Sequence, residues 1–389
     1  MAACGKSFAG LVAVVLACAA CTSAPSDVPE TPTSAAPGTL LADPVDFTGY
    51  PALASLTSTS VSVLYGSTSG IDGSTTAVSG LVLVPKGEPP SGGWPIVSVG
   101  HATTGTDTRC APSRRIGLLG SLTTVIPFLA NGYVVAMTDY QGLGAPGPHP
   151  YLDSTTAAFN VIDIVRAARE VEPATSETWV GYGVSQGGQA VWAANEQAGD
   201  YGGGLRLAGT ISMSPATDLT PVVSAMEEGT LTREQVILLP SVLKGLSVAH
   251  PDLVTSDYLH GELFDRRDVF TACEGENSGL QSSIAESVTP ADYAPVDRAA
   301  ADRLRAWLSD AGVPRRAATA PMFVGYGDLD TLTLPAWTID AVRRACALGD
   351  TVELREAAGQ GHGILDLGSA PAEWLRGRYA GEPAPSTCG

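Results

Sequence analysis

Short apolar segments alternate with amphipathic stretches along most of the chain. Most of the later apolar segments are nearly continuous runs, which is typical of strands covered on both faces, as in a parallel sheet. The predicted strands are Val61–Tyr65, Val78–Val84, Ile96–Gly100, Tyr133–Thr138, Thr178–Tyr182, Leu207–Met213, Pro321–Tyr326 and Thr351–Glu356. Helices are predicted between them at Thr155–Glu170, Gln186–Gln197 and Thr338–Leu348. This alternation predicts an α/β fold with a mostly parallel central sheet flanked by helices.

The alternation stops over residues 217–312. This stretch has apolar residues at helical spacing and no convincing buried strand, and it ends near the helix-like segment Asp297–Ala311. We interpret it as a helical insertion over one end of the sheet. Its apolar residues are expected to line an acyl site, to pack the insertion onto the sheet, or both; they are Val236–Leu239, Leu243 and Leu246.

The first residues have the features of an export signal. Lys6 precedes the apolar run Phe8–Ala20, which is too short to span a bilayer as a stable helix. We therefore predict a signal peptide at 1–20. Cys18 and Cys21 each follow an alanine, as in a bacterial lipoprotein box, so either one is a candidate lipidation site. The alternative is a plain secreted protein whose cysteines fall in the discarded signal.

The predicted signal peptide is followed by a linker and one large domain. Residues 21–44 are rich in Ser, Thr, Pro and Ala without periodicity, which predicts a disordered linker. Residues 45–389 are assigned to the folded domain. Beyond the signal region four cysteines remain, and in an exported protein they predict two disulfides with three alternative pairings: Cys110, Cys273, Cys346 and Cys388.

Composition and charge exclude two classes of protein. The apolar fraction of 44% in 389 residues is too high for a disordered chain and sufficient for a large core. Forty acidic residues against 22 basic ones give a net charge of −18, which repels phosphate backbones. Nucleic-acid binding is therefore not expected.

The segment Gly183-Val184-Ser185-Gln186-Gly187 fits the pattern G-x-S-x-G. In α/β hydrolases this pattern forms a sharp turn between a strand and a helix, and its glycines allow close backbone approach. A strand-like segment precedes it and a helix-like segment follows it, so the context agrees. Ser185 is the candidate nucleophile.

A serine hydroxyl needs a base to take its proton, and that base needs an orienting group. His362 lies in a glycine-rich turn after the last predicted strand, late in the chain as the order Ser, acid, His requires. His101 precedes the serine and is in the wrong place for the base. The other histidines are expected to be exposed or packing residues: His149, His250 and His260.

Three aspartates compete for the role of the acid. Asp328 and Asp330 both follow the predicted strand Pro321–Tyr326, and Asp218 follows Leu207–Met213. The spacing Gly327-x-x-Asp330, with Pro335 downstream, favours Asp330. The other aspartate of the pair is interpreted as a helix cap or turn residue.

Donors for an oxyanion are expected from two backbone segments. The first is the N–H of Gln186, directly after the nucleophile. The second is the loop after Ile96–Gly100, where either Thr103 or Thr104 could supply an N–H. The sequence leaves both threonines as candidates for this donor.

Five segments in this order resemble the secretory lipase family of fungi and actinobacteria: GHATTGTDTRCAPS, DYQGLGAPGPHPYL, GYGVSQGGQAVWAANE, DLDTLTLPAWT and GQGHG. The resemblance runs from about Phe47 to the C-terminus. It implies an α/β-hydrolase fold with a helical lid at about 217–312. It places Ser185, Asp330 and His362 at the nucleophile, acid and base positions, and it implies the pairings Cys110–Cys273 and Cys346–Cys388.

These observations predict a secreted or lipid-anchored serine hydrolase that cleaves carboxylic esters of lipid-like substrates through an acyl-enzyme. No metal or organic cofactor is expected. The predicted partners are an ester or lipid substrate and, through an N-terminal anchor, a membrane surface. The same machinery would serve a serine peptidase or an acyltransferase, and a surface lipoprotein that lost catalysis is a further alternative.

Overall fold

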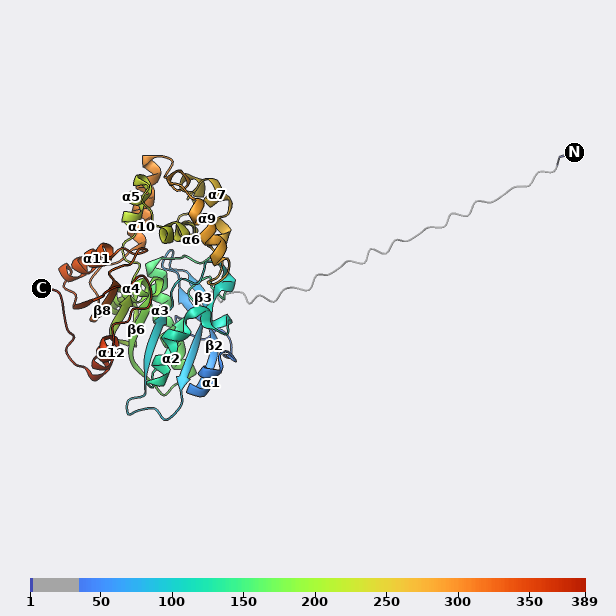
Figure 1. The fold of residues 1–389 in the computed structure, drawn as a ribbon. Helices are drawn as coiled ribbons and strands as arrows, with labels where there is room; N and C mark the ends of the chain where they lie inside the picture. The colour runs from blue at the N-terminus through green and yellow to red at the C-terminus, as the bar shows by residue number, and fades with distance from the viewer. Residues whose placement is uncertain (3–34) are drawn as a thin grey trace. The chain divides into compact units, whose positions relative to one another are not determined.

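The computed structural model describes residues 1–2 and 35–389, and its centre is a nine-stranded sheet (Figure 1). The strand order is β1-β2-β3-β5-β4-β6-β7-β8-β9. The strands are β1 (Val45–Asp46), β2 (Thr57–Thr68), β3 (Thr75–Pro85), β4 (Trp94–Gly100), β5 (Val134–Thr138), β6 (Thr175–Val184), β7 (Arg206–Met213), β8 (Met322–Gly327) and β9 (Val352–Ala357).

The sheet is mostly parallel, as predicted. From β5 through β4, β6, β7 and β8 to β9, every neighbouring pair is parallel. The antiparallel part consists of β1, β2 and β3, and β3 pairs antiparallel with β5. The eight predicted strands are all present, whereas the two-residue β1 was not predicted. Both of its residues are exposed, so they carry no hydrophobic signal.

Helices cover both faces of the sheet. On one face, α3 (Ser154–Val171), α4 (Gln186–Tyr201) and α11 (Pro335–Ala347) share a core with the strands. On the other face lie α1 (Pro51–Leu56), α2 (Leu122–Ala130) and α12 (Ala370–Ala380), whose Leu53, Val125 and Trp374 are buried against the sheet. The predicted α/β architecture is confirmed.

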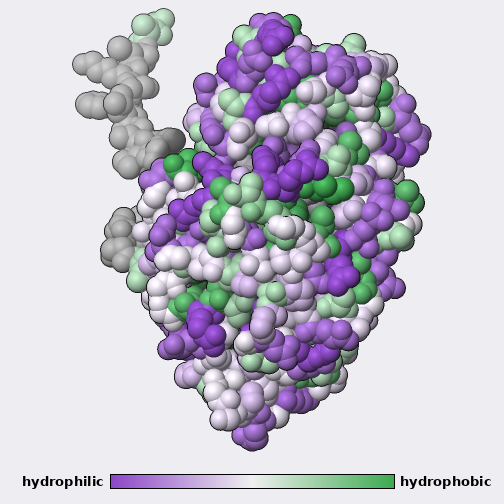
Figure 2. Space-filling model, turned by 90° about the vertical axis from the view of Figure 1, so that its left-hand side faces the viewer, coloured by the Kyte–Doolittle hydropathy of each residue, from purple (hydrophilic) through white to green (hydrophobic). Residues whose placement is uncertain are grey.

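Between β7 and β8 the chain forms helices that lie above the sheet in Figure 1. They have a hydrophobic core of their own that includes Val223, Leu243 and Leu304. The outer surface of this insertion is mostly hydrophilic, and hydrophobic atoms gather below it where it meets the sheet domain (Figure 2). The helices are α5 (Thr220–Glu228), α6 (Arg233–Ala249), α7 (Gly261–Asp265), α8 (Arg267–Phe270), α9 (Ser278–Ser287) and α10 (Arg298–Ala311).

Residues 38–41, which fall in the predicted linker, are paired with the sheet. The Leu41 N–H donates to Leu64 O at 2.8 Å and the Gly38 N–H to Gly66 O at 2.7 Å, so residues 38–41 pair with β2. The prediction of a disordered linker up to residue 44 is therefore wrong for this part. Backbone carbonyl groups of β2 accept these hydrogen bonds. Such pairing does not depend on side chains, so the amino-acid composition of the segment could not predict it. Residues 3–20 of the predicted signal peptide, with Cys18, and also Cys21 lie outside the described residues.

Both disulfides have the predicted pairing. Cys110 is bonded to Cys273, with Cα atoms 5.0 Å apart, and Cys346 to Cys388, with Cα atoms 5.4 Å apart. The second bond fixes the C-terminal tail beside β9, where the Thr387 N–H donates to Val352 O at 2.7 Å. Across residues 1–2 and 35–389, no helix combines the length and apolar character needed to cross a bilayer.

Replacing both Cys346 and Cys388 by serine is expected to lower the free energy of unfolding by about 2–4 kcal/mol, because the bond closes a loop of 42 residues in the unfolded chain. Urea denaturation of the oxidised wild type and the double variant measures this difference. An unchanged unfolding midpoint would contradict a stabilising role for the tail.

Glu196 on α4 predicts a pH-dependent stability. Burial raises the pKa of its carboxyl group to about 7, while the hydrogen bond that the carboxylate accepts from the Arg315 N–H favours the charged form. The folded state thus keeps a proton that the unfolded state loses near pH 4.5, so this contribution to stability is lost as the pH rises through about 7.

The free energy of unfolding of Glu196→Gln is therefore expected to rise relative to that of wild type by about 2–3 kcal/mol when the pH is raised from 5 to 8. The measurement is the free energy of unfolding at both pH values. Glu228→Gln, at an exposed position of α5, is the control and should show no such gain. Equal pH profiles for wild type and Glu196→Gln would refute the buried-proton explanation.

Candidate active site

Ser185 occupies a sharp turn between β6 and α4. Its backbone has φ 57° and ψ −116°, a conformation that costs free energy for any residue with a side chain. The turn needs glycine on both sides: a Cβ on Gly183 would overlap the carbonyl of Gly187, and a Cβ on Gly187 would overlap the carbonyl of Gly100. The G-x-S-x-G pattern thus has a steric basis in this chain, and Ser185 is 8% exposed.

His362 bridges Ser185 and Asp330. Its Nε2 lies 2.8 Å from Ser185 Oγ, and its Nδ1 lies 2.8 Å from Asp330 Oδ2. His362 comes from the loop after β9 and Asp330 from the loop after β8, at the same end of the sheet as the Ser185 turn. The structure brings the three residues selected from the sequence into one hydrogen-bonded chain.

The Asp330 carboxylate is held by several donors. Its Oδ1 accepts the N–H groups of Leu332 at 2.9 Å and Thr333 at 3.0 Å, and its Oδ2 accepts the Thr333 hydroxyl at 2.9 Å. Burial opposes its ionisation, but the hydrogen bond and charge of His362, with these donors, outweigh burial and lower the pKa of Asp330. The carboxylate therefore stays ionised and oriented toward Nδ1 of His362.

The competing aspartates point elsewhere. Asp328 is exposed and accepts the Gly359 N–H at 2.6 Å, which makes it a turn residue. Asp218 accepts the Thr220 N–H at 3.0 Å at the start of α5 and pairs with Arg344 at 3.0 Å. Asp330 is the one of these three that His362 contacts.

The remaining histidines have structural contacts. His101 is buried, with Nδ1 2.6 Å from Ala102 O, and His260 Nε2 lies 2.9 Å from Ala294 O. His250 stacks on Trp307 with ring centroids 4.8 Å apart. His149 is buried as well, and it contacts a residue of the site.

His149 fixes the side chain that follows the nucleophile. Its Nδ1 donates to Gln141 O at 2.7 Å, which leaves Nε2 to accept from Gln186 Nε2 at 3.2 Å. Burial lowers the pKa of His149 to about 4, so the ring is neutral at ordinary pH and this acceptor role is kept. Gln186, as the first residue of α4, has a backbone N–H without an acceptor in its own helix.

The two threonines of the other oxyanion segment differ in their surroundings. The Thr104 hydroxyl is buried and donates to Cys110 O at 2.8 Å. The Thr103 hydroxyl lies 2.6 Å from the Tyr151 hydroxyl, and Thr103 lines a cavity beside the Ser185 turn. Of the two threonines, Thr103 is thus the one that lines this cavity.

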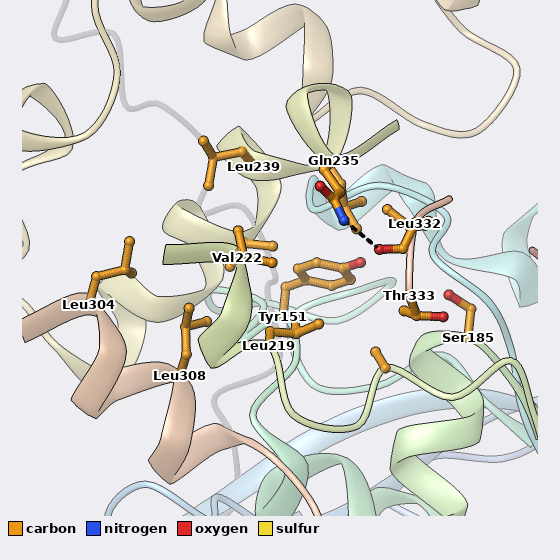
Figure 3. Close-up of a pocket in the computed structure, with 13 residues that line it drawn as sticks. Tyr151, Ser185, Leu219, Val222, Gln235, Leu239, Leu304, Leu308, Leu332 and Thr333 are labelled. Carbon is orange, nitrogen blue, oxygen red and sulfur yellow. Dashed lines mark hydrogen bonds between the residues drawn. The ribbon is translucent and has the colours of Figure 1, made fainter. Parts of the chain in front are cut away.

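An apolar cavity opens beside Ser185 toward the insertion (Figure 3). Its free volume is about 30 Å³, room for one or two water molecules. Gln235 of α6 closes one side by donating to Leu332 O at 3.1 Å. Apolar side chains from α5, α6 and α10 make up most of its wall: Leu219, Val222, Leu238, Leu239, Val242, Leu304 and Leu308.

The apolar residues that were expected to line an acyl site, pack the insertion, or both divide between the two roles. Leu238 and Leu239 line the cavity, whereas Val236, Leu243 and Leu246 are buried in the core of the insertion. Successive apolar residues on one helix face different neighbours, so the run Val236–Leu239 could not all point to the cavity.

Sequence reasoning missed three residues that hold the site together. They are Thr333 beside Asp330, His149 beside Gln186, and Ser214, whose hydroxyl donates to Gly363 O at 3.1 Å directly after His362. Thr333 is three residues from Asp330, a spacing that signals such a turn contact. His149 and Ser214 are distant in the chain from their partners and give no local signal. In the described part of the chain, no group of three or more His, Cys, Asp or Glu side chains could hold a metal ion.

A named bacterial protein is similar to part of this chain. A protein of Mycobacterium tuberculosis named probable inactive lipase MT1628 is 34% identical over 176 residues, which are 41% of this chain and 38% of that protein. The aligned region thus spans well under half of that relative.

Solved structures share the fold at low sequence identity. Candida antarctica lipase A has a TM-score of 0.70 at 16% identity, over 91% of this chain and 84% of that one. The rice cell wall degrading esterase LipA of Xanthomonas oryzae has a TM-score of 0.67 at 19% identity, over 89% and 96%.

The family assignment rests on a longer match. The model of the family described as secretory lipase matches residues 118–387, which include the Ser185 turn, the insertion and the loops that carry Asp330 and His362. The chain therefore belongs to the secretory lipase family.

Proposed function

We propose that this chain is a serine hydrolase that cleaves carboxylic esters with apolar acyl groups through an acyl-enzyme on Ser185. The observation that carries the proposal is the position of His362. Its Nε2 lies 2.8 Å from Ser185 Oγ, and its Nδ1 lies 2.8 Å from Asp330 Oδ2. A hydroxyl, an imidazole and a carboxylate in this order form the arrangement that activates a serine.

In the first half of the reaction, His362 Nε2 takes the proton of Ser185 as Oγ attacks the ester carbonyl carbon. Asp330 holds the ring through Nδ1–H and stabilises its positive form. The N–H of Gln186, with that of Thr103, stabilises the oxyanion, and each such donor typically lowers the barrier by about 3–4 kcal/mol. His362 then gives its proton to the departing alkoxide, and the acyl group stays on Oγ.

In the second half, water replaces the alcohol. His362 takes a proton from this water as its oxygen attacks the acyl carbon. Collapse of the second tetrahedral intermediate returns a proton to Ser185 and releases the carboxylic acid. The chain's own side chains perform every proton transfer in this scheme.

The apolar cavity supports an acyl chain rather than a peptide amine as the group next to Ser185. An exopeptidase for free amino termini needs a carboxylate to bind the amine, and no acidic side chain lines this cavity. Two of the acidic residues of the insertion pair with arginines instead: Glu227 with Arg305 at 2.6 Å and Asp257 with Arg303 at 3.0 Å.

The two disulfides support export of the chain, because such bonds persist in oxidising compartments. We propose that the protein is secreted or held at the cell surface, with Cys18 or Cys21 as the site of a lipid anchor.

Ser185→Ala and Asp330→Asn test the mechanism. The first is expected to abolish labelling by a fluorophosphonate probe, and the second to lower kcat on p-nitrophenyl esters by about 10³- to 10⁴-fold because the imidazole loses its orientation. Asp328→Asn is the matched control and should keep wild-type kcat.

A wild-type protein that neither reacts with the probe nor cleaves any ester would reject catalysis and favour a binding role. Cleavage of aminoacyl anilides in preference to esters would instead favour a peptidase.

Val222→Trp tests the acyl site. Val222 is partly buried in the cavity wall on α5, so a larger side chain fills the space without displacing the core. We expect KM for a decanoyl ester to rise by about tenfold, since burial of several CH₂ groups is lost, while KM for an acetyl ester stays constant.

Val254→Trp, at an exposed position of the insertion, is the control for this change. Equal kinetics of wild type and Val222→Trp on the decanoyl ester would exclude this cavity as the acyl site.

A further inference from the structure

A cavity of about 280 Å³ lies on one face of the sheet between α2 and α12, and we call it the α2–α12 cavity. Tyr182 of β6 and Ile211 of β7 line it from the sheet, and Phe128 and Leu375 line it from the two helices. It shares no lining residue with the apolar cavity beside Ser185. Its free volume is close to the lower end of the range of small-molecule sites, about 300–1,000 Å³.

Aromatic and aliphatic side chains form a continuous surface in this cavity. The Phe128 ring packs edge-on against Tyr182, with ring centroids 5.1 Å apart, and against Tyr133 at 6.3 Å. Pro127 and Ile364 extend this surface toward solvent, where both are exposed. An apolar chain laid along this surface is removed from water, which favours its binding.

Two tyrosine hydroxyls in the α2–α12 cavity have no hydrogen-bond partner among the described residues. Tyr133 is 9% exposed, and burial raises the pKa of its hydroxyl. Burial also raises the pKa of Tyr182 to about 12. Other buried tyrosines do have partners, such as Thr103 for Tyr151. The hydroxyls of Tyr133 and Tyr182 are therefore protonated at neutral pH and can donate to a ligand.

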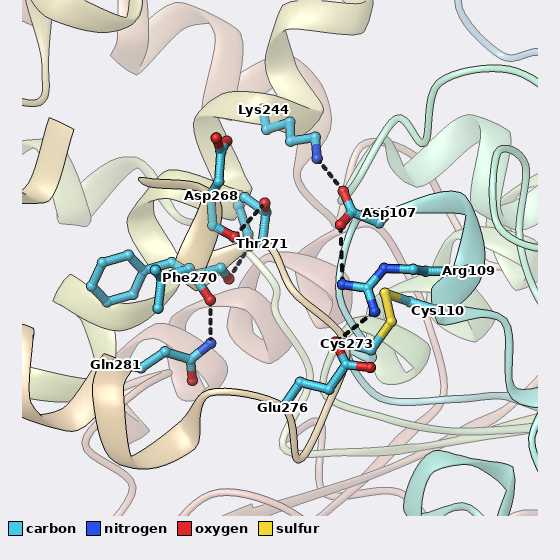
Figure 4. Close-up of polar contacts among 12 residues, drawn as sticks. Asp107, Arg109, Cys110, Lys244, Asp268, Phe270, Thr271, Cys273, Glu276 and Gln281 are labelled. Carbon is cyan, nitrogen blue, oxygen red and sulfur yellow. Dashed lines mark hydrogen bonds and ion pairs between the residues drawn. A yellow bond between two sulfur atoms is a disulfide. The ribbon is translucent and has the colours of Figure 1, made fainter. Parts of the chain in front are cut away.

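Arg376 of α12 supplies a positive charge to this cavity. It is exposed, and it makes neither a hydrogen bond nor an ion pair with any described residue. Every other arginine of the chain makes one, such as that of Arg109 with Glu276 at 2.6 Å (Figure 4). The charge of Arg376 opposes the effect of burial on the pKa of Tyr133, so the guanidinium lies near that hydroxyl.

The charge of the lining selects the ligand. No aspartate, glutamate or lysine lines the α2–α12 cavity, so Arg376 is its charged side chain. A guanidinium and a phenol are both donors, and a carboxylate accepts from both. The aromatic surface beside them suits an apolar chain. The lining therefore matches an anion that carries such a chain.

We infer that the α2–α12 cavity binds a fatty acid, with its carboxylate on Arg376 and Tyr133 and its chain along Phe128 and Tyr182. The site is separate from the triad, and binding there requires no catalysis. The proposed function releases an acid of this kind as its product. Only the source of the ligand thus rests on the proposed function.

Calorimetric titration of the double variant Ser185→Ala/Val222→Trp with octanoate tests the inference, because this protein forms no acyl-enzyme and its apolar cavity is filled. Adding Arg376→Ala is expected to raise Kd by about tenfold, since a charge-assisted hydrogen bond is lost. Adding Tyr133→Phe should raise Kd by about threefold. Arg376→Lys keeps the charge and should recover part of the affinity. Arg298→Ala, at an exposed position of α10 outside both cavities, is the control.

Two further ligands separate the contribution of the carboxylate from that of the chain. 1-Octanol has no charge, so it should bind about tenfold more weakly than octanoate, and Arg376→Ala should leave its Kd unchanged. Butyrate lacks four CH₂ groups and should bind at least about tenfold more weakly than octanoate. Equal affinities for octanoate and either of these ligands would overturn the inference.

The outcomes distinguish this site from the proposed function. A Kd for octanoate that neither Arg376→Ala nor Tyr133→Phe changes would overturn the fatty-acid site, even where wild type hydrolyses esters. Octanoate binding that depends on Arg376 supports the site, even where wild type hydrolyses none. In that second case the proposed function fails alone.

Discussion

The contact between Gly187 and the backbone of Gly100 is the constraint on which the site depends. It brings the start of α4 against the end of β4, and the chain can make this approach only where both residues lack a side chain. Ser185, two residues before this contact, has a positive φ, and it lies at the carboxyl end of β6, beside the carboxyl ends of β8 and β9. The loops after these strands then need to span only short distances to bring Asp330 and His362 to it. The same approach places the Gln186 N–H next to the loop that carries Thr103.

Around this fixed centre the insertion gives the two sides of Ser185 different character. The helices α5, α6 and α10 form a narrow apolar space whose walls must separate before a chain can enter. The segment around Cys273 instead contributes Glu274 to a larger cavity beside the loop that carries Thr103.

Much of this arrangement could be predicted from the sequence because local signals specify it. Continuous apolar runs identified the parallel strands, and the glycines around Ser185 identified the turn. The spacing of Gly327 and Asp330 favoured the carboxylate that contacts His362. Other features have no local signal. α12 has no clear apolar face, α2 contains Pro127, and β1 is two exposed residues long, so periodicity could not find them.

Residues that act through distant contacts were also beyond the sequence. His149 and Gln186 are 37 positions apart, and the segment around Cys273 meets the loop at 104–106 through backbone hydrogen bonds and the Cys110–Cys273 bond. The apolar residues of α6 were expected to line an acyl site, to pack the insertion, or both, and they divide between the cavity and the core of the insertion. Which of them faces the cavity depends on how α6 packs on α8 and α9, and this is a property of tertiary packing.

The C-terminal tail has a consequence for the behaviour of the whole molecule in solution. β9 is the last strand of the sheet, and Thr387 satisfies Val352 O and the Leu354 N–H on its outer side. An uncovered edge of this kind is a template for strand addition by another molecule. With the tail held there by the Cys346–Cys388 bond, this end of the sheet is blocked against edge-to-edge association, and reduction of that bond removes the block.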